Sequence, residues 1–340
     1  MNIIRKTWHL ARIFAAYRRR REVVPIMPIR LWIESSSGCN LQCVMCPNKA
    51  MHGSAKGMMR FDLFRKIIDE VKGSVHDIYL HHRGEPFLNP ALFDMIAYAR
   101  AAGINTRFHT NGCLMDEGKA RRLLDASPDL VSFSVDGFEK TAYEAVRAGA
   151  DFETTMANIL RLLELRRTSG RRRPYVVVER IRFKQPPPGE TPATIEALTR
   201  RLLDAGLDEV IVKEEYAWAQ PDAPASNGPR CYTRCTFPWY AMVICWDGSV
   251  TPCPQDFYAV LKMGDARTSS LREIWNGPSY RDHRRRLNSD IESLSLCRNC
   301  DRLRRKTVGG VPLQYMATFL TDHLVGYNRL RRMLGTAERN

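Results

Sequence analysis

Three cysteines fall within eight residues of one another, at Cys39, Cys43 and Cys46. Their thiolates can converge on one metal centre, and thiolates are the usual ligands of iron–sulfur clusters. A four-iron cube held by only three thiolates keeps one iron open, where a substrate or cofactor can bind. A structural zinc site usually draws two separated ligand pairs and closes all four positions. The spacing C-x3-C-x2-C therefore favours an iron–sulfur cluster over structural zinc.

A second group of cysteines lies late in the chain. It comprises Cys231, Cys235, Cys245, Cys253, Cys297 and Cys300, while Cys113 stands alone between the two groups. Disulfides are rare in cytoplasmic proteins, where clustered thiols usually serve metal binding or catalysis. We therefore expect two metal sites in two regions of the chain.

Strand-like and helix-like segments alternate around the first group of cysteines. Residues 29–34 alternate with period two and predict a strand that leads into the cysteine loop. Helices are then expected over 61–72, 90–102, 116–126, 151–168 and 191–205, and strands over 77–81, 105–109, 130–135, 175–181 and 209–212. Such alternation implies a parallel sheet with crossover helices. Six units fit before residue 215, too few for an eightfold barrel, so we expect an α/β fold with a partial barrel or an open sheet.

The pattern changes outside this region. Residues 220–230, with three prolines and several small residues, predict a linker. Residues 313–334 predict a helix that ends among arginines. Residues 2–21 predict a short amphipathic helix that ends in four arginines and places on one side Ile3, Leu10, Phe14 and Tyr17.

The chain is basic, with a net charge of +15 in 340 residues. Such a charge indicates nucleic-acid binding, attraction to an anionic membrane, or merely a basic exterior. The charge is dispersed and no nucleic-acid-binding motif accompanies it, so nucleic acid is not an expected partner. No apolar run approaches the ~20 residues that cross a bilayer, and no secretory signal is present. We therefore expect a cytoplasmic protein.

The first cysteine loop resembles the signature of the radical S-adenosylmethionine (SAM) superfamily. The resemblance lies in the segment Gly38-Cys39-Asn40-Leu41-Gln42-Cys43-Val44-Met45-Cys46-Pro47-Asn48 and in its place after a first strand. It implies that the three cysteines hold a [4Fe–4S] cluster whose fourth iron binds SAM. Reduction then splits SAM into methionine and a 5′-deoxyadenosyl radical. It also implies an electron donor such as flavodoxin or ferredoxin.

Further segments match the family in the expected order. Residues 81–86 resemble its Gly-Gly-Glu motif, which contacts the SAM amino group; Arg83 replaces the first glycine, whereas Gly84 and Glu85 remain. Residues 110–112 fall where the motif of the third strand is expected. Residues 132–137 resemble the end of the fourth strand. The resemblance implies that Ser134 and Arg147 also bind SAM, with the Arg147 fork on its carboxylate.

The late cysteines resemble the SPASM-type auxiliary domain that many radical SAM enzymes carry. Its marks are the G-x4-C spacing from Gly248 to Cys253 and the segment Glu-Ile-Trp-Asn at 273–276. Only four cysteines match cleanly, so we expect one fully ligated [4Fe–4S] cluster on Cys235, Cys253, Cys297 and Cys300. Structural zinc stays the alternative, and Cys231 is an alternative ligand to Cys235.

The resemblance gives expected roles to three residues near these sites. Asp256 falls where some relatives place a catalytic proton acceptor, and a surface aspartate is the plain alternative. Cys113 and Cys245 are either hydrogen-atom donors to a substrate radical or small buried apolar residues.

The fold that follows is a partial (β/α)6 barrel of the radical SAM type with a small cysteine-rich auxiliary cluster domain after it. We expect an N-terminal helix over 1–28, a radical SAM core over 29–220, an auxiliary domain over 221–305 and a C-terminal helix over 306–340.

The substrate is the least determined feature. A sugar-like or lipid-linked small molecule fits the compact architecture, with dehydrogenation or epimerisation as the net reaction. A peptide-modifying maturase is the alternative enzyme, and a basic iron–sulfur or zinc protein that binds nucleic acid is the alternative of another class. The two basic terminal helices suggest peripheral contact with the inner face of a membrane, and packing of both helices on the protein is the alternative.

Overall fold

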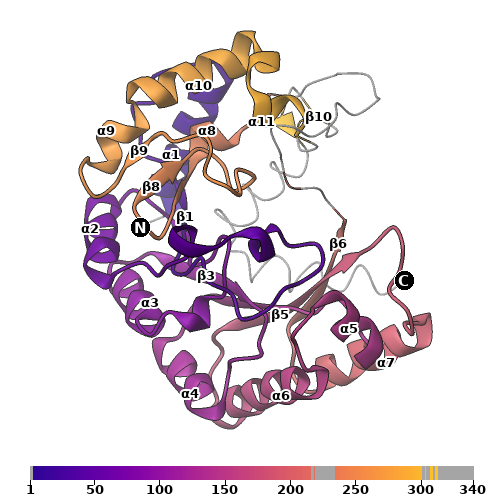
Figure 1. Cartoon of the computed structure of the whole chain (residues 1–340). Helices are drawn as coiled ribbons and strands as arrows, with labels where there is room; N and C mark the ends of the chain where they lie inside the picture. The colour runs from indigo at the N-terminus through magenta and orange to yellow at the C-terminus, as the bar shows by residue number, and fades with distance from the viewer. Residues whose placement is uncertain are drawn as a thin grey trace. The chain divides into compact units, whose positions relative to one another are not determined.

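The computed structural model describes residues 3–215, 218, 234–300, 303, 307–308 and 311–312 (Figure 1). The predicted linker at 220–230, the predicted helix at 313–334 and Cys231 lie outside the described residues. The chain forms two compact units. Unit 1 comprises Met1–Trp32, Lys66–Asp77 and Tyr216–Asn340, and unit 2 comprises Ile33–Arg65 and Ile78–Glu215.

Unit 2 is built on an open parallel sheet with the strand order β6-β5-β4-β3-β2. Its strands are β2 (Asp77–Tyr79), β3 (Asn105–Thr110), β4 (Leu130–Ser134), β5 (Tyr175–Arg182) and β6 (Glu209–Glu214). Its helices are α3 (Leu92–Ala101), α4 (Glu117–Ala126), α5 (Lys140–Val146), α6 (Phe152–Thr168) and α7 (Pro192–Asp204). The pairs β3–β4, β4–β5 and β5–β6 are all parallel. The expected α/β alternation and the partial barrel are confirmed.

Local sequence signals explain where the helices of unit 2 begin. Asp116 and Asp151 accept hydrogen bonds from backbone N–H groups in the first turns of α4 and α6. Thr191 forms a capping box with Thr194 at the start of α7, where proline occupies the first turn. Helix α5, with seven residues, was not predicted because so short a segment gives no clear periodicity.

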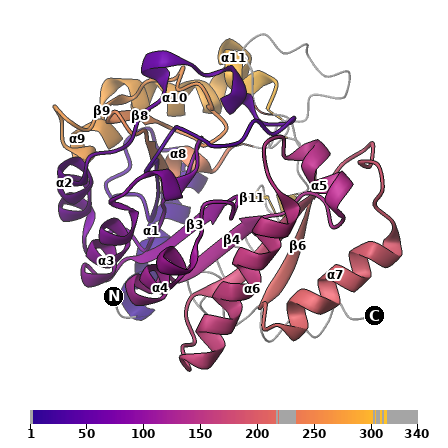
Figure 2. The same cartoon turned by 60° about the horizontal axis from the view of Figure 1, so that its bottom comes forward.

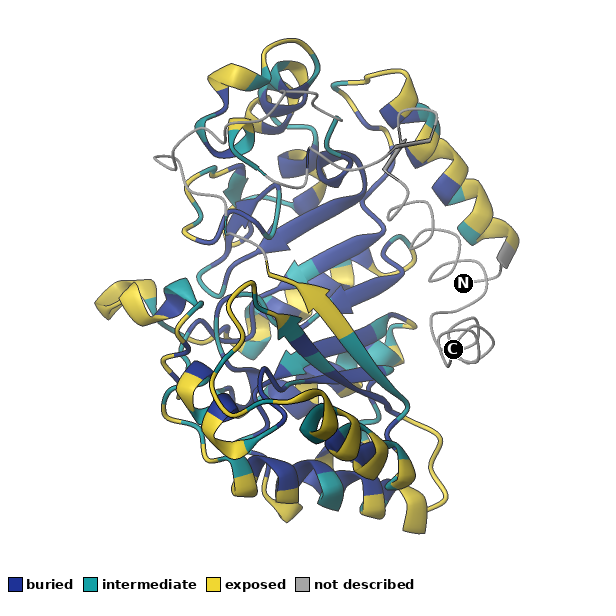
Figure 3. Cartoon of the chain, turned by 90° about the vertical axis from the view of Figure 1, so that its right-hand side faces the viewer, coloured by how far each residue is buried: buried dark blue, intermediate teal, exposed yellow. Residues whose placement is uncertain are grey.

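One face of the unit 2 sheet is covered by helices. Figures 1 and 2 show α3, α4 and α6 side by side along it. Phe108, Phe133 and Val178 are fully buried, and their neighbours one position along each strand point to the opposite face. The outermost strand β6 is half-buried to exposed (Figure 3). The core of unit 2 therefore lies between the sheet and its helices, and the other face stays partly accessible.

Unit 1 contains the segments that bear the late cysteines. Strands β7 (Ala241–Ile244), β8 (Ser249–Thr251) and β9 (Gly264–Asp265) form an antiparallel meander. The other elements are α1 (Ile3–Arg18), β1 (Arg30–Ile33), the second half of α2 (Phe61–Val71), α8 (Phe237–Tyr240), α9 (Leu271–Trp275), α10 (Pro278–Ser289), the 3-10 turn η4 (Ile291–Ser293), α11 (Ser295–Arg298), and the hairpin of β10 (Thr307–Val308) and β11 (Val311–Pro312).

Buried aromatic residues tie the N-terminal segment into unit 1. Trp239 donates from Nε1 to the carbonyl of Arg21 at 2.9 Å, and Trp275 donates to that of Ile26 at 2.8 Å. The guanidinium of Arg284 lies over the Trp275 ring. Both indoles are fully buried, so residues 21–26 supply acceptors that the core of unit 1 requires.

Helix α1 is amphipathic as expected, with one correction. Leu10, Ile13 and Tyr17 are buried, and the Tyr17 hydroxyl donates to the carbonyl of Arg234 at 2.9 Å. Phe14, which we placed on the same side, is 51% exposed. The reason is the helical repeat: positions 10, 13 and 17 form one stripe, and position 14 falls at its edge.

Candidate functional site

The loop that carries the first three cysteines is fixed by backbone hydrogen bonds within unit 2. Gln42 and Val44 donate their N–H groups to the carbonyls of Ala148 and Val146, at 2.9 and 3.0 Å. Cys43 is buried, and Cys39 and Cys46 are half-buried. The loop ends at the 3-10 turn η1 (Pro47–Ala50), which begins with proline. The three thiols therefore stand on a braced segment.

Burial dominates the electrostatics of the three thiols. The pKa of Cys39 is raised to about 11, chiefly by burial; the hydrogen bond from the Leu41 N–H opposes this rise, and the nearby Glu85 carboxylate adds to it. Burial also raises the pKa values of Cys43 and Cys46, which the Arg147 guanidinium opposes. Arg147 Nη1 lies 3.9 Å from Cys43 Sγ. Buried thiolates need compensating positive charge, which iron ions supply when thiolates ligate them.

A glycine allows the turn after β2 to lie directly against the cysteine loop. A Cβ at Gly84 would come within 2.3 Å of the Gly38 carbonyl oxygen and 2.5 Å of that of Ser36. The Glu85 N–H donates to the Gly38 carbonyl at 2.8 Å. Any side chain at position 84 would therefore push the cysteine loop away.

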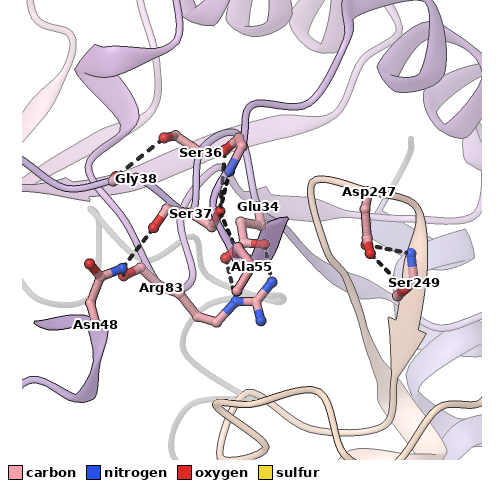
Figure 4. Close-up of polar contacts among 10 residues, drawn as sticks. Glu34, Ser36, Ser37, Gly38, Asn48, Ala55, Arg83, Asp247 and Ser249 are labelled. Carbon is pink, nitrogen blue, oxygen red and sulfur yellow. Dashed lines mark hydrogen bonds and ion pairs between the residues drawn. The ribbon is translucent and has the colours of Figure 1, made fainter. Parts of the chain in front are cut away.

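A buried ion pair holds this turn in place. Arg83 donates from Nε and Nη2 to the two carboxylate oxygens of Glu34, each at 2.6 Å, in a two-point contact (Figure 4). Both side chains are almost fully buried. Asn48 donates to the carbonyls of Ser37 and Arg83, at 2.7 and 2.6 Å. The sequence showed Arg83 only as a departure from the family motif. Its pairing with Glu34, which directly follows β1, was not predicted.

The Glu85 carboxylate is already well supplied with hydrogen bonds from the protein. Oε1 accepts from the Phe87 N–H at 3.1 Å and the Thr110 hydroxyl at 2.8 Å, and Oε2 accepts from the Asn111 N–H at 2.8 Å. Burial raises the pKa of Glu85, and these three donors oppose that shift. The predicted strand-end motifs at 84–85 and 110–112 therefore meet in space.

Arg147 and Ser134 lie at the same end of the sheet. Ser134 is the last residue of β4 and is half-buried. Arg147 follows α5 and pairs through Nη2 with Asp136. Its Nε is buried without a hydrogen-bond partner among the described residues. Asp136 also accepts the Ile181 N–H at 2.8 Å. Sequence reasoning missed the partnership of Asp136 with Arg147, although it had named the segment that carries Asp136.

The late cysteines lie in unit 1. Burial raises the pKa of Cys297 well above its usual value, and Cys253, Cys300 and Asp256 add to that shift, so these groups are neighbours. Cys235 precedes α8 and acts electrostatically on Tyr17. Among the described residues no three Cys, His, Asp or Glu side chains gather around a point that suits a single metal ion. A four-iron cube spaces its thiolates more widely than one ion does.

Asp256 is fully buried rather than on the surface. Its Oδ1 accepts the Val260 N–H at 2.9 Å, and its Oδ2 accepts the Leu261 N–H at 2.8 Å. The carboxylate therefore caps the loop that follows Cys253.

Cys113 and Cys245 occupy separate positions. Cys113 Sγ lies 3.4 Å from the Thr155 hydroxyl in unit 2. Cys245 is buried after β7 in unit 1, and its N–H donates to the Ser249 carbonyl at 2.8 Å.

The residues of unit 2 fit the cofactors that the resemblance implies. Three thiols on one braced loop form a donor set for a four-iron cluster with one open iron. The close approach at Gly84 holds the turn that carries the Glu85 carboxylate directly against this loop, and a carboxylate suits the amino group of an amino-acid-like ligand.

Comparison with known proteins agrees with this site. Residues 33–172 match the Radical SAM superfamily, and residues 235–301 match the SPASM iron–sulfur cluster-binding domain. The chain is 27% identical over 300 residues to the tungsten-containing aldehyde ferredoxin oxidoreductase cofactor-modifying protein of Pyrococcus furiosus, covering 74% of this chain and 81% of that protein.

Two solved structures have a similar fold. BtrN in complex with AdoMet and 2-DOIA has a TM-score of 0.54 at 18% identity, covering 81% of this chain and 93% of BtrN. Streptococcus suis SuiB bound to precursor peptide SuiA has a TM-score of 0.62 at 14% identity, covering 85% of this chain and 74% of SuiB.

The matched domains define the cofactors. The radical SAM domain binds a [4Fe–4S] cluster and SAM, and the SPASM domain binds auxiliary iron–sulfur clusters. None of the helices in the described part of the chain has the length and hydrophobicity that a membrane crossing requires. This chain belongs to the radical SAM superfamily of enzymes and carries a SPASM domain after its radical SAM domain.

Proposed function

We propose that the chain uses SAM to abstract a hydrogen atom from an unactivated C–H bond of a small sugar-like or lipid-linked substrate. Dehydrogenation or epimerisation is the net reaction. When bound, the cluster and SAM supply a 5′-deoxyadenosyl radical that takes the hydrogen. The single observation that carries the proposal is the contact of the cysteine loop with the Gly84–Glu85 turn at the carboxyl end of the sheet, where open α/β sheets bind their ligands.

We assign the following roles to the residues of unit 2. Cys39, Cys43 and Cys46 ligate the cluster. Gly84 leaves room for the cysteine loop, and Glu85 keeps part of its carboxylate capacity for the SAM amino group, because two oxygens offer about four acceptor positions and three are used.

Arg147 is proposed to orient the SAM carboxylate together with Ser134. Its pairing with Asp136 holds the guanidinium in one direction, and its Nε, buried without a hydrogen-bond partner among the described residues, remains as a donor. The contact with Cys43 keeps this cation beside the cluster ligands.

In unit 1 we propose one auxiliary [4Fe–4S] cluster on Cys235, Cys253, Cys297 and Cys300. A cluster with four protein ligands accepts or passes an electron and does not bind SAM. Asp256 shapes the loop after Cys253 through its two backbone contacts, and we propose that this carboxylate also serves as the catalytic proton acceptor.

The test is formation of 5′-deoxyadenosine by the anaerobically reconstituted full chain with SAM and a strong reductant. Cys43→Ala is expected to abolish the product. Cys113→Ala is the matched control, because Cys113 lies in unit 2 outside the ligand set, and it is expected to retain product formation. Retained turnover in Cys43→Ala contradicts the proposal.

A peptide-modifying activity is the second candidate, since SuiB, a fold relative, was solved with a precursor peptide. BtrN, solved with a small molecule, has the more similar length, with 93% of its chain covered. Stimulation of 5′-deoxyadenosine formation by metabolite or lipid extracts supports the small-substrate proposal. Stimulation by peptide fractions alone supports the maturase.

We also propose that α1 lies on an anionic membrane surface. Its buried stripe packs within unit 1, while Trp8 is 65% exposed and Phe14 is 51% exposed. Residues 1–21 contain seven lysines and arginines and no acidic residue. Aromatic side chains and cations together favour the interface of an anionic bilayer.

Co-sedimentation with vesicles tests this contact. Vesicles with phosphatidylserine are expected to bind the protein, and Trp8→Ser with Phe14→Ser is expected to release it. Exposed Tyr258→Ser is the matched control. Equal binding of the control and the double variant contradicts a role for α1.

A further inference from the structure

Two histidines stack on the accessible face of the unit 2 sheet. His81 follows β2 and His109 lies in β3, with ring centroids 4.1 Å apart and ring planes inclined by 27°. Glu179 on β5 and Lys213 on β6 complete the group: His109 Nδ1 lies 3.4 Å from Glu179 Oε2, and Lys213 pairs with the same oxygen. None of these four residues has a role in the reaction as described above.

The strand register places this group opposite the helices. His109 pairs with Ser132 in β4, and Ser134 pairs with Glu179 in β5, so these side chains share one face. The side chains of His109, Glu179 and Lys213 are 23%, 13% and 44% exposed. A ligand on this face can therefore reach them.

The hydrogen bonds of the imidazoles give the two rings opposite tautomers. The backbone N–H of His109 donates to His81 Nδ1 at 3.1 Å, so the proton of His81 resides on Nε2. The Glu179 carboxylate beside His109 Nδ1 favours a proton there, which leaves His109 Nε2 as an acceptor. Within the described residues neither Nε2 atom has a protein hydrogen-bond partner. The stacked pair thus presents one donor and one acceptor.

The group is electrically neutral. Burial lowers the pKa of both histidines well below the usual value. His81 faces His109, Glu179, His82 and Lys213, and His109 faces Lys213 and Arg147. Glu179 balances Lys213, and Asp136 balances Arg147. Within the group of His81, His109, Glu179 and Lys213, the one cation, Lys213, is paired with Glu179, so these four side chains offer no unpaired cation to a phosphate or carboxylate of the substrate.

Its position links the group to the chemistry of unit 2. Thr110, which donates to Glu85, follows His109 directly, and Gly84 lies three residues after His81. The group therefore stands on the accessible face next to the carboxyl ends of β2 and β3, the end at which the proposed SAM-binding residues lie.

We propose that His81, His109, Glu179 and Lys213 bind the substrate, and that this substrate is a neutral, polyhydroxylated ring such as a sugar or cyclitol. A hydroxyl group both donates and accepts a hydrogen bond. Adjacent hydroxyls therefore match the two donor–acceptor pairs on this face, which are His81 with His109 and Lys213 with Glu179. This inference rests on the proposed function and narrows its substrate class.

Saturation-transfer NMR on the anaerobically reconstituted full chain tests the inference. The probes are myo-inositol, methyl glucopyranoside and N-acetylglucosamine, compared with glucose 6-phosphate and trialanine. At least one neutral probe is expected to bind. His81→Phe and His109→Phe keep an aromatic ring for stacking and remove the hydrogen bonds, so each is expected to weaken binding about tenfold. Exposed His52→Phe, the same substitution in unit 2, is the matched control and is expected to leave binding unchanged.

Several outcomes overturn the inference. They are preference for the phosphate or the peptide, failure of every neutral probe at millimolar concentration, and unchanged binding in both histidine variants. Nitrogen NMR of the two rings gives an independent readout that also detects misfolded variants: an imidazolium at neutral pH in either ring excludes the neutral site. Substrate-free 5′-deoxyadenosine formation by the wild-type chain tests the proposed function separately.

Discussion

The pair of Arg83 and Glu34 illustrates how one residue constrains the site. Arg83 stands where relatives carry glycine, yet its side chain does not enter the space beside the cysteine loop, because the two-point contact with Glu34 draws it away. The chain therefore keeps only the glycine at position 84, where no side chain fits. In this chain the residue that replaces the first glycine of the motif is buried together with an oppositely charged partner.

Arg83→Met is expected to destabilise the protein by about 3–5 kcal/mol, because it leaves the buried Glu34 carboxylate without its partner. Thermal unfolding measures the loss. Arg60→Met is the matched control, since Arg60 also pairs with a carboxylate but both side chains are largely exposed, and it is expected to leave Tm unchanged. If the Arg83→Met protein is as stable as wild type, water must hydrogen-bond the Glu34 carboxylate in place of Arg83.

At the scale of elements, the loop–turn contact depends on the absence of a side chain. Gly84→Ala is expected to displace the cysteine loop, because the new Cβ would meet backbone atoms of Gly38 and Ser36 rather than a flexible side chain. Iron content and SAM binding of the reconstituted protein should both fall severalfold. Gly118→Ala in α4 is the control, where the added Cβ makes an ordinary contact with Asp116. Full iron content and SAM binding in Gly84→Ala argue against this role.

Helix α10 carries an acid-sensitive element. Burial lowers the pKa of His283 to about 4, so the folded state excludes a proton that the unfolded state binds below pH ~6.5. Stability from this group is complete above that pH and is lost as the pH falls toward 4, by on the order of 3 kcal/mol. His283→Leu is expected to flatten the decline of Tm between pH 7 and 4.5. Exposed His52→Leu should keep the wild-type slope, and an unchanged slope in His283→Leu refutes the assignment.

The elements of unit 2 were predictable because its long helices and strands carry their own periodicity, and α4, α6 and α7 also carry N-terminal caps. The short α5 carried too little signal, yet it fixes Val146 and Ala148 against the cysteine loop. The spacing of the cysteines predicts the cluster ligands, and that assignment stays a prediction. The partners Glu34 for Arg83 and Asp136 for Arg147 were not predictable, because side-chain pairing across distant segments leaves no local pattern.

The buried state of Asp256 was also beyond sequence reasoning. An aspartate after a cysteine gives no sign of whether its carboxylate faces water or caps a loop. The carboxylate caps the loop because it accepts the backbone N–H groups of Val260 and Leu261, four and five residues later. That geometry depends on the path of the whole loop.

At the scale of the whole molecule, residues from the start of the chain complete the unit that bears the late cysteines. Besides the acceptors for the two buried indoles, the carbonyl of Glu22 accepts from Arg284 Nη1 at 2.8 Å. Removal of these acceptors would leave buried donors unsatisfied, at about 1–3 kcal/mol each. The apolar stripe of α1 would be lost as well. We therefore expect the auxiliary cluster to require the N-terminal segment.

Deletion of residues 1–28 tests this dependence most sharply in a Cys39→Ala, Cys43→Ala, Cys46→Ala background, where only the proposed auxiliary cluster remains. Iron is expected to fall from about four atoms per chain to nearly none. Deletion of residues 2–8 is the matched control, because it keeps Leu10, Ile13 and Tyr17 and all three backbone acceptors, and it should retain the iron. If the longer deletion also retains four iron atoms, the auxiliary cluster forms without the N-terminal acceptors, and their hydrogen bonds to Trp239, Trp275 and Arg284 serve only the stability of the surrounding core.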